Sequence, residues 1–158
     1  MKWYKRTIVL AIGLMAELIF AALSAFLIRA NGDWVESLVL PYFALRSPLL
    51  FAALSEITYL FSALSLAAYA ERRRDLPKGV LCLASEGVSE IAFLCFFFEL
   101  TYEISSFFIA TACMVLSFIN LWIFSKQNYI AVLLRLPVVL IKVYLWTIIY
   151  CILTLNFT

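Results

Sequence analysis

The sequence predicts an all-α, polytopic membrane protein, with five transmembrane helices packed in a single bundle. Of its 158 residues, 66% are hydrophobic and only 14% are charged. A soluble domain of this size needs far more polar surface. Five apolar stretches are also long enough to cross a hydrocarbon core about 30 Å thick, which takes roughly 20 residues. They run at about 7–28, 47–70, 79–98, 105–125 and 129–155.

These stretches are expected to be helices because backbone groups inside a bilayer must be satisfied within the segment. A β-barrel would show short strands of alternating polarity, and no such pattern occurs. No stretch between the spans is long enough to fold alone, so residues 1–158 are predicted to form one domain. A separate soluble catalytic module is thereby excluded. The net charge of +2 is too small to indicate nucleic acid as a partner.

The first stretch, 7–28, could be mistaken for a signal peptide because basic residues precede its apolar run. The run is longer than a typical signal core, and it contains Glu17, which is unusual in such a core. We therefore expect a membrane span that is kept in the mature protein.

Basic residues outside the spans lie on alternate loops, which predicts the orientation. Eight basic residues fall on one side of the membrane: Lys2, Lys5, Arg6, Arg72, Arg73, Arg74, Lys78 and Lys126. Two fall on the other side: Arg29 and Arg46. By the positive-inside rule, the amino terminus is cytoplasmic and the carboxyl terminus lies outside. An odd number of spans fits this asymmetry. We expect an integral protein of the plasma (inner) membrane.

The first loop, residues 29–46, is the longest connection. It begins with the turn signal Asn31-Gly32-Asp33. The apolar and aromatic residues that follow are Trp34, Leu38, Leu40, Tyr42 and Phe43. Few charged residues lie among them, so the loop is not expected to stay in water. We expect it to fold onto the helix ends as a lid, or to form an aromatic belt at the membrane surface.

The later connections are shorter. Pro77 and Gly79 suit the start of the third helix after a charged turn. The third loop, around Glu99 to Ser105, is so short that the helices on either side should form an antiparallel hairpin. Pro137 lies about one third of the way along the last span, where it removes a backbone hydrogen bond and is expected to kink the helix.

Ionisable residues inside the spans are the strongest functional signal. Each is costly in the bilayer and should face the bundle interior: Glu17, Glu56, Glu86, Glu90 and Lys142. Glu86 and Glu90 share one helix face, so their repulsion predicts that at least one is protonated. Lys142 is taken as the only basic residue deep in the bilayer and needs an acidic partner among these four. The cluster could recognise a ligand or fix helix packing, and no chain of histidine or aspartate supports a proton relay.

The sequence favours a binding protein over an enzyme. The four cysteines, Cys82, Cys95, Cys113 and Cys151, all lie within spans. Histidine is absent and the cysteine spacing matches no zinc-binding pattern. We expect these cysteines to be small buried hydrophobic residues. No nucleophile–base pair or phosphate loop is present. The sequence therefore predicts no catalytic residue and no metal ligand, and these residues indicate no certain cofactor.

The first loop and the helix after it carry a resemblance to a known family. Trp34 and Pro41 are seven residues apart, and Phe43 follows them. This order resembles the translocator protein family, also called tryptophan-rich sensory proteins (TspO/MBR type), which are five-helix membrane proteins of similar length. Phe51, Ser55 and Tyr59 stand where that family has Phe, Trp and Tyr at four-residue steps.

The resemblance extends through the later spans. The family's aromatic run at the end of its third helix is matched by FLCFFF at 93–98, and its Asn-type positions before that run are replaced by Glu86 and Glu90. Its Leu-Pro step at the start of the fifth helix is matched by Leu136-Pro137. Ile141 replaces a family tryptophan, and Trp146 lies just over one turn further on.

The resemblance implies a homodimer in which each bundle has a pocket closed by the first loop. The implied ligand is a tetrapyrrole such as porphyrin or haem, or a related lipid-like molecule. The implied ligand-binding residues are Trp34, Pro41, Tyr42, Phe43, Phe51, Ser55, Tyr59, Glu86, Glu90, Phe97, Ile141, Lys142 and Trp146.

Three functions follow from these observations. The prediction is a membrane-embedded binding or sensory protein for a hydrophobic planar ligand. One alternative is a small transport or assembly component of a membrane complex. The other is a porphyrin-degrading enzyme, which the loss of tryptophan at Ser55 and Ile141 disfavours.

Overall fold

The computed structural model describes residues 3–30, 37–44, 48–71, 76–126 and 128–157. Within these ranges the chain forms five long α-helices and one π-helical turn, with no strand, so the predicted all-α fold is confirmed. The elements are α1 at Trp3–Ala30, α3 at Pro48–Glu71, α4 at Leu76–Leu94, η1 (the π-helical turn) at Cys95–Glu99, α5 at Glu103–Ser125 and α6 at Tyr129–Phe157.

Each long helix contains a segment that is long and apolar enough to cross a membrane. These segments, in the described part of the chain, are Thr7–Ala30, Leu50–Ala70, Leu76–Glu99, Glu103–Ser125 and Tyr129–Asn156. Their ends lie within three residues of the predicted ones. Large apolar side chains also cover the outside of the bundle, where Phe26 is 66% exposed, Leu81 70% and Leu140 68%. A lipid environment satisfies such a surface, and the chain is an integral membrane protein.

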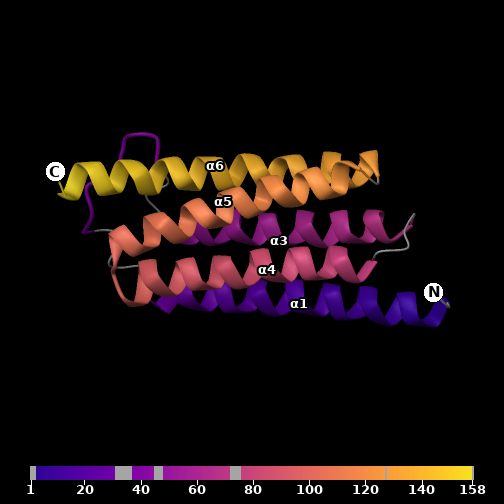
Figure 1. Ribbon diagram of the computed structural model, residues 1–158. Helices are drawn as coiled ribbons and strands as arrows, with labels where there is room; N and C mark the ends of the chain where they lie inside the picture. Colours follow the sequence, from indigo (N-terminus) through magenta and orange to yellow (C-terminus); the bar gives the residue numbers. More distant parts are fainter. Residues whose placement is uncertain (1–2, 31–36, 45–47, 72–75, 127, 158) are drawn as a thin grey trace.

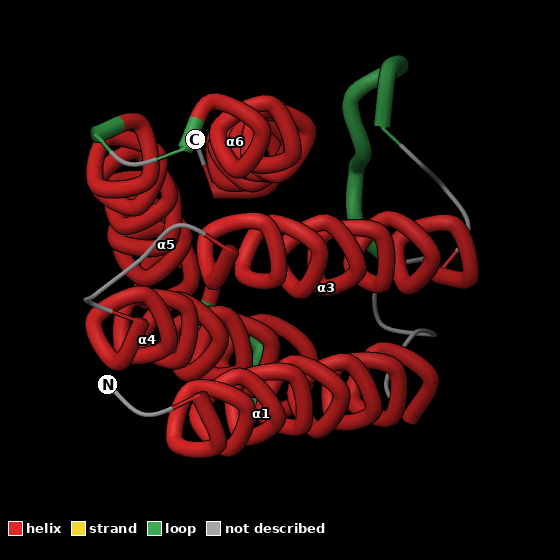
Figure 2. Tube along the Cα trace, turned by 90° about the vertical axis from the view of Figure 1, so that its right-hand side faces the viewer, coloured by secondary structure: helices red, strands yellow, loops and turns green. Residues whose placement is uncertain are grey.

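The helices form a closed ring in the order α1, α3, α6, α5, α4 and back to α1 (Figure 2). The start of α1 and the end of α6 lie at opposite ends of the bundle (Figure 1). α1, α4 and α6 therefore run in one direction, and α3 and α5 run in the other. Because α5 separates α4 from α6 in the ring, side chains of α4 and α6 meet across the bundle centre.

Small residues allow the backbones to approach closely. A Cβ atom on Gly87 of α4 would lie 2.3 Å from Cδ2 of Phe20 on α1. A Cβ atom on Gly13 of α1 would lie 2.5 Å from Cδ2 of Leu66 on α3. Glycine at both positions makes room for a large apolar side chain of the neighbouring helix, as in close-packed membrane helices.

The corner between α4 and α5 is a wide turn followed by one strained residue. The N–H of Leu100 donates to the carbonyl oxygen of Cys95 (3.1 Å), and the N–H of Tyr102 donates to that of Phe96 (3.0 Å). Thr101 has a φ of 53°, a left-handed conformation that is unfavourable for a β-branched residue. The turn reverses the chain, and α4 and α5 pack together as the predicted hairpin.

Helix α6 continues through Pro137 without a break. The kink predicted at this residue remains a prediction.

Two apolar clusters occupy the two ends of the bundle. One contains Leu66, Tyr69, Leu83 and Phe124, toward the end where α1 begins. The other contains Phe51, Phe93, Phe97 and several residues of the second half of α6, toward the opposite end. On α3, α4 and α6, the buried polar side chains fall between these clusters in the sequence. The bundle therefore has a polar layer near its middle with an apolar core on each side.

Candidate functional site

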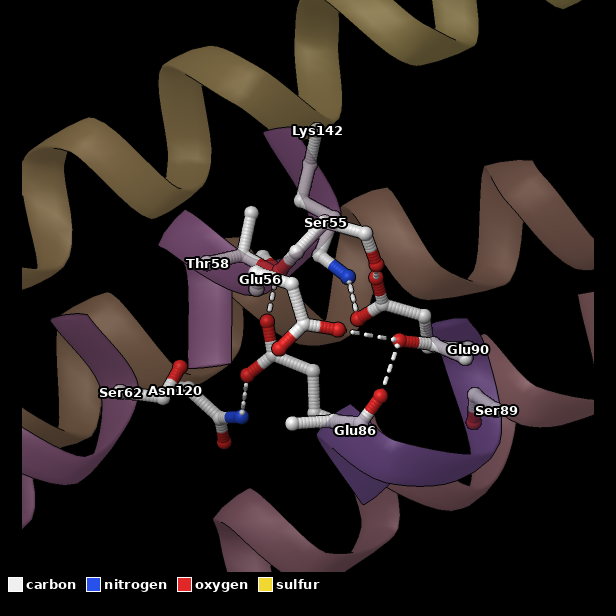
Figure 3. Close-up of polar contacts among 12 residues, drawn as sticks. Ser55, Glu56, Thr58, Ser62, Glu86, Ser89, Glu90, Asn120 and Lys142 are labelled. Atoms are coloured by element: carbon white, nitrogen blue, oxygen red, sulfur yellow. Dashed lines mark hydrogen bonds and ion pairs between the residues drawn. The ribbon is translucent and has the colours of Figure 1, made fainter. Parts of the chain in front are cut away.

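The polar layer receives side chains from all five long helices. Its buried members, each no more than 6% exposed, include Glu17, Ser55, Thr58, Ser62, Glu86, Glu90, Ser117, Asn120, Arg135 and Lys142. Figure 3 shows part of this cluster, with Lys142 of α6 reaching toward Glu90 of α4 and Asn120 lying beside Glu86.

Glu86 is the more completely bonded of the two acids on α4. Its Oε2 forms an ion pair with the guanidinium of Arg135 and accepts a 2.7 Å hydrogen bond from Nδ2 of Asn120. Its Oε1 accepts from Oγ of Ser117. Arg135 donates from its other terminal nitrogen to Oγ of Ser62, at 2.9 Å. This set of bonds joins α3, α4, α5 and α6 around one carboxylate.

Glu90 lies one turn further along α4. Its Oε2 pairs with Nζ of Lys142, and its Oε1 accepts a 3.2 Å hydrogen bond from Oγ of Ser55. The prediction that Lys142 has an acidic partner is confirmed. Glu86 and Glu90 each pair with a cation of their own, and the expected protonation of one of them stays a prediction.

Arg135 was missed by the sequence prediction. Lys142 is not the only basic residue deep in the bilayer, because Arg135 lies within the same span and its side chain is fully buried. A signal was present: the two residues are seven apart, which is about two helical turns, so they lie on the same face of α6. Because Arg135 and Lys142 both lie in the last span, two cations are available to pair with Glu86 and Glu90 of the third span.

Glu17 of α1 lines the same small polar space as Glu86, Glu90 and Lys142, whereas Glu56 of α3 faces α1. Glu17 is only 5% exposed, yet it has no hydrogen bond or ion pair with any other described residue. Glu56 is half-buried and accepts a 3.3 Å hydrogen bond from Oγ of Ser24. Neither acid is paired with a cation in the described structure.

A small cavity adjoins the Lys142–Glu90 pair on the side of the aromatic cluster. Its volume is about 20 Å³, which is room for about one water molecule. Its lining includes aromatic rings from three helices: Phe51, Phe93 and Trp146. Nε1 of Trp146 donates to Oγ1 of Thr111 at 2.9 Å, which fixes the orientation of the indole.

Residues 37–44 of the first loop cover the apolar cluster that surrounds this cavity. Leu38, Leu40 and Ala44 pack against it. The backbone of Val39 is held by the side chain of Asn156, which accepts from its N–H at 2.9 Å and donates to its oxygen at 3.1 Å. The hydroxyl of Tyr144 donates to the oxygen of Phe43 at 2.9 Å. The described part of the loop thus lies beside the second half of α6 (Figure 1).

The structure brings together some of the predicted ligand-binding residues. Those that line the cavity are Phe51, Ser55, Glu90, Lys142 and Trp146. Glu86 and Tyr59 line a neighbouring polar space of about 10 Å³. Phe97 and Ile141 belong to the surrounding apolar cluster without lining the cavity.

The predicted loop residues are placed differently. Pro41 is buried, and the carbonyl oxygen of Phe43 accepts the hydrogen bond from the hydroxyl of Tyr144. Tyr42 is 93% exposed and lies outside the cavity. Trp34 lies outside the described residues, as does the side chain of Pro48.

Comparison of the chain with models of known protein families and with curated protein sequences gives no match. The likeness to the translocator family therefore rests on the motifs of the first loop and of the later spans.

Proposed function

We propose that this chain is a membrane-embedded binding or sensory protein of translocator type, whose ligand is a hydrophobic planar molecule such as a tetrapyrrole. The observation that carries the proposal is the cavity that Phe51, Phe93 and Trp146 line together with the Lys142–Glu90 pair. Aromatic rings offer flat surfaces for stacking. A buried lysine can form a charge-assisted hydrogen bond with a ligand carboxylate.

Binding of such a ligand requires the cavity to enlarge. Its volume of about 20 Å³ is far below the roughly 300–1,000 Å³ of typical ligand pockets. The described conformation is then the closed form, and access requires residues 37–44 to move away from the end of α6. Their bonds to Asn156 and Tyr144 lie near the surface, where they can break without exposing the ion-paired layer.

The proposal is tested by titrating the purified protein with protoporphyrin and following tryptophan fluorescence. We expect saturable quenching that loses much of its amplitude in Trp146→Phe. Trp122→Phe is the matched control, because Trp122 is 62% exposed on the outside of the bundle. Quenching that does not saturate, or that depends equally on both tryptophans, contradicts binding in the cavity.

A second comparison tests the role of the charge. The double variant Lys142→Met/Glu90→Gln removes both charges of the pair together, so neither partner is left as an unpaired ion. We expect it to bind protoporphyrin roughly tenfold more weakly, which corresponds to about 1.4 kcal/mol. The dimethyl ester of protoporphyrin has no carboxylate, so its affinity should be equal in the double variant and the wild type.

We also propose that the amino terminus is cytoplasmic, that the carboxyl terminus lies outside, and that the protein is a homodimer in the plasma (inner) membrane. Lys78 at the start of α4 and Lys126 after α5 lie at the end of the bundle where α1 begins, whereas Arg29 lies at the other end. This distribution supports the orientation by the positive-inside rule. Alkaline phosphatase fused after the last residue should be active, and light scattering of the purified protein tests the dimer.

A further inference from the structure

A second hollow lies on the side of the bundle, between α1 and α3. Its volume is about 420 Å³, and leucine, methionine and alanine side chains of the two helices form most of its walls. Its polar groups are Glu17, Glu56 and Tyr59. We call it the lateral groove. It is distinct from the aromatic cavity, whose lining comes from α3, α4, α5 and α6 and includes no residue of α1.

Two buried polar groups of the lateral groove have no partner in the described structure. Glu17 is 5% exposed and has no hydrogen bond or ion pair with another described residue. Tyr59 is 4% exposed, and its hydroxyl has no hydrogen-bond partner among the described residues. Unmatched polar groups are costly within a bilayer. Because both residues line a hollow large enough for a ligand, a bound molecule could satisfy them.

The charges of the interior indicate the sign of that molecule. Arg135 and Lys142 are committed to Glu86 and Glu90. Glu17 and Glu56 have no such partner among the described residues. Arg29, in the last turn of α1, is exposed; its charge acts on Glu56 without a direct ion pair to that carboxylate. The lateral groove is therefore the part of the described interior whose two carboxyl groups are not ion-paired with a cation.

We propose that the lateral groove binds a lipophilic cation that reaches it from the hydrocarbon core of the membrane. The positive centre lies beside Glu17 and Glu56, and the apolar body packs against the walls of α1 and α3. The ring of Tyr59 lies between the helices and adds a cation–π surface. The volume of about 420 Å³ falls within the range of ligand pockets.

The test uses tetraphenylphosphonium and tetraphenylborate, which have closely similar shapes and opposite charges. Binding of each is measured by equilibrium dialysis against the protein in lipid nanodiscs, with empty nanodiscs subtracted. We expect saturable binding of the cation alone. Glu17→Gln should weaken it at least tenfold, and Tyr59→Phe, which keeps the ring, only a few-fold. Equal binding of both ions, or cation binding that persists unchanged in Glu17→Gln/Glu56→Gln, overturns the proposal.

A second pair of variants tests the place without changing any acid. Leu60 lines the lateral groove and is 57% exposed, so Leu60→Trp fills the groove from the lipid side. Leu81→Trp makes the same change at an exposed site of α4 outside the groove. We expect Leu60→Trp to abolish cation binding and Leu81→Trp to leave it intact. Wild-type binding in Leu60→Trp excludes the groove as the site.

Folding is checked by helical circular dichroism and by the thermal unfolding midpoint of each variant. Quenching by protoporphyrin should persist in Leu60→Trp, because Leu60 lines the lateral groove but not the aromatic cavity or the small polar space that Glu17 shares with Glu90 and Lys142. Loss of cation binding with quenching retained in this variant separates the two binding proposals.

Discussion

Glu90 of α4 and Lys142 of α6 form an ion pair across the centre of a ring in which α5 separates their helices. Glu86 and Arg135 form a second such pair. The acids are four residues apart and the cations seven, which correspond to rises of about 6 Å and 10 Å. The long side chains of Arg135 and Lys142 make up this difference. The two pairs together fix the axial register of α4 against α6.

Removing one member of a buried pair should be more harmful than removing both. Arg135→Met leaves Glu86 buried with only Ser117 and Asn120 as donors, and we expect the free energy of unfolding to fall by about 3–5 kcal/mol. In Arg135→Met/Glu86→Gln the uncompensated charge is gone, so much of this loss should be recovered. Unfolding by denaturant in detergent micelles measures both. Losses that add up in the double variant would show that the two residues do not interact.

The contact between α1 and α4 depends on Gly87. A methyl group there would overlap the ring of Phe20, so Gly87→Ala should destabilise the bundle by about 1–3 kcal/mol. In the Phe20→Ala background the same change should cost much less, because the ring is absent. Val88→Ala, at a position that is 59% exposed, is the control for altering this turn of α4. The thermal unfolding midpoint is measured for the wild type, the two single variants, the double variant and the control, and an equal cost in both backgrounds contradicts the contact.

The corner at Thr101 should become more stable when the side chain is removed. Thr101→Gly relieves the left-handed backbone strain but makes the unfolded chain more flexible, and the net gain should be about 1 kcal/mol. Thr101→Val keeps the β-branch and should give no gain. Denaturant unfolding of the three proteins decides between them. A glycine variant that is less stable than the wild type would show that the hydroxyl contributes more than the strain costs.

The described part of the first loop should open more often when its bonds to α6 are removed. Asn156→Ala deletes two hydrogen bonds to Val39, and we expect amide exchange in residues 38–44 to be roughly tenfold faster. Tyr144→Phe deletes one bond and should have a smaller effect. Hydrogen–deuterium exchange followed by mass spectrometry measures both. Peptides from the middle of α5 serve as the internal reference and should be unchanged.

The membrane spans could be predicted closely because the signal is local: a span is apolar over a length that the bilayer sets. The partner of Lys142 could be predicted only as one of four acids. Its identity depends on the order of the helices in the ring, which is determined by packing between distant segments. Arg135 could have been recognised from its place in the last span.

The lateral groove had no comparable signal. Glu17 and Glu56 were recognised as costly residues, but nothing in the sequence shows that α1 and α3 leave a hollow between them. That hollow depends on how the side chains of two helices fill the space where they meet, a property of shape that residue type alone does not determine. The same holds for the small volume of the aromatic cavity.

The crossing ion pairs also bear on how the chain is made. Glu86 is synthesised 49 residues before Arg135, and Glu90 is 52 residues before Lys142. At a synthesis rate of about 5–20 residues per second, Arg135 and Lys142 are made roughly 3–10 seconds after the acids of α4. Ser117 and Asn120 of α5 are synthesised before Arg135, so they can form hydrogen bonds with Glu86 first. We expect the translocation machinery to keep α4 out of the lipid until α6 is released. A stop codon placed before Arg135 should therefore give a fragment that is rapidly degraded.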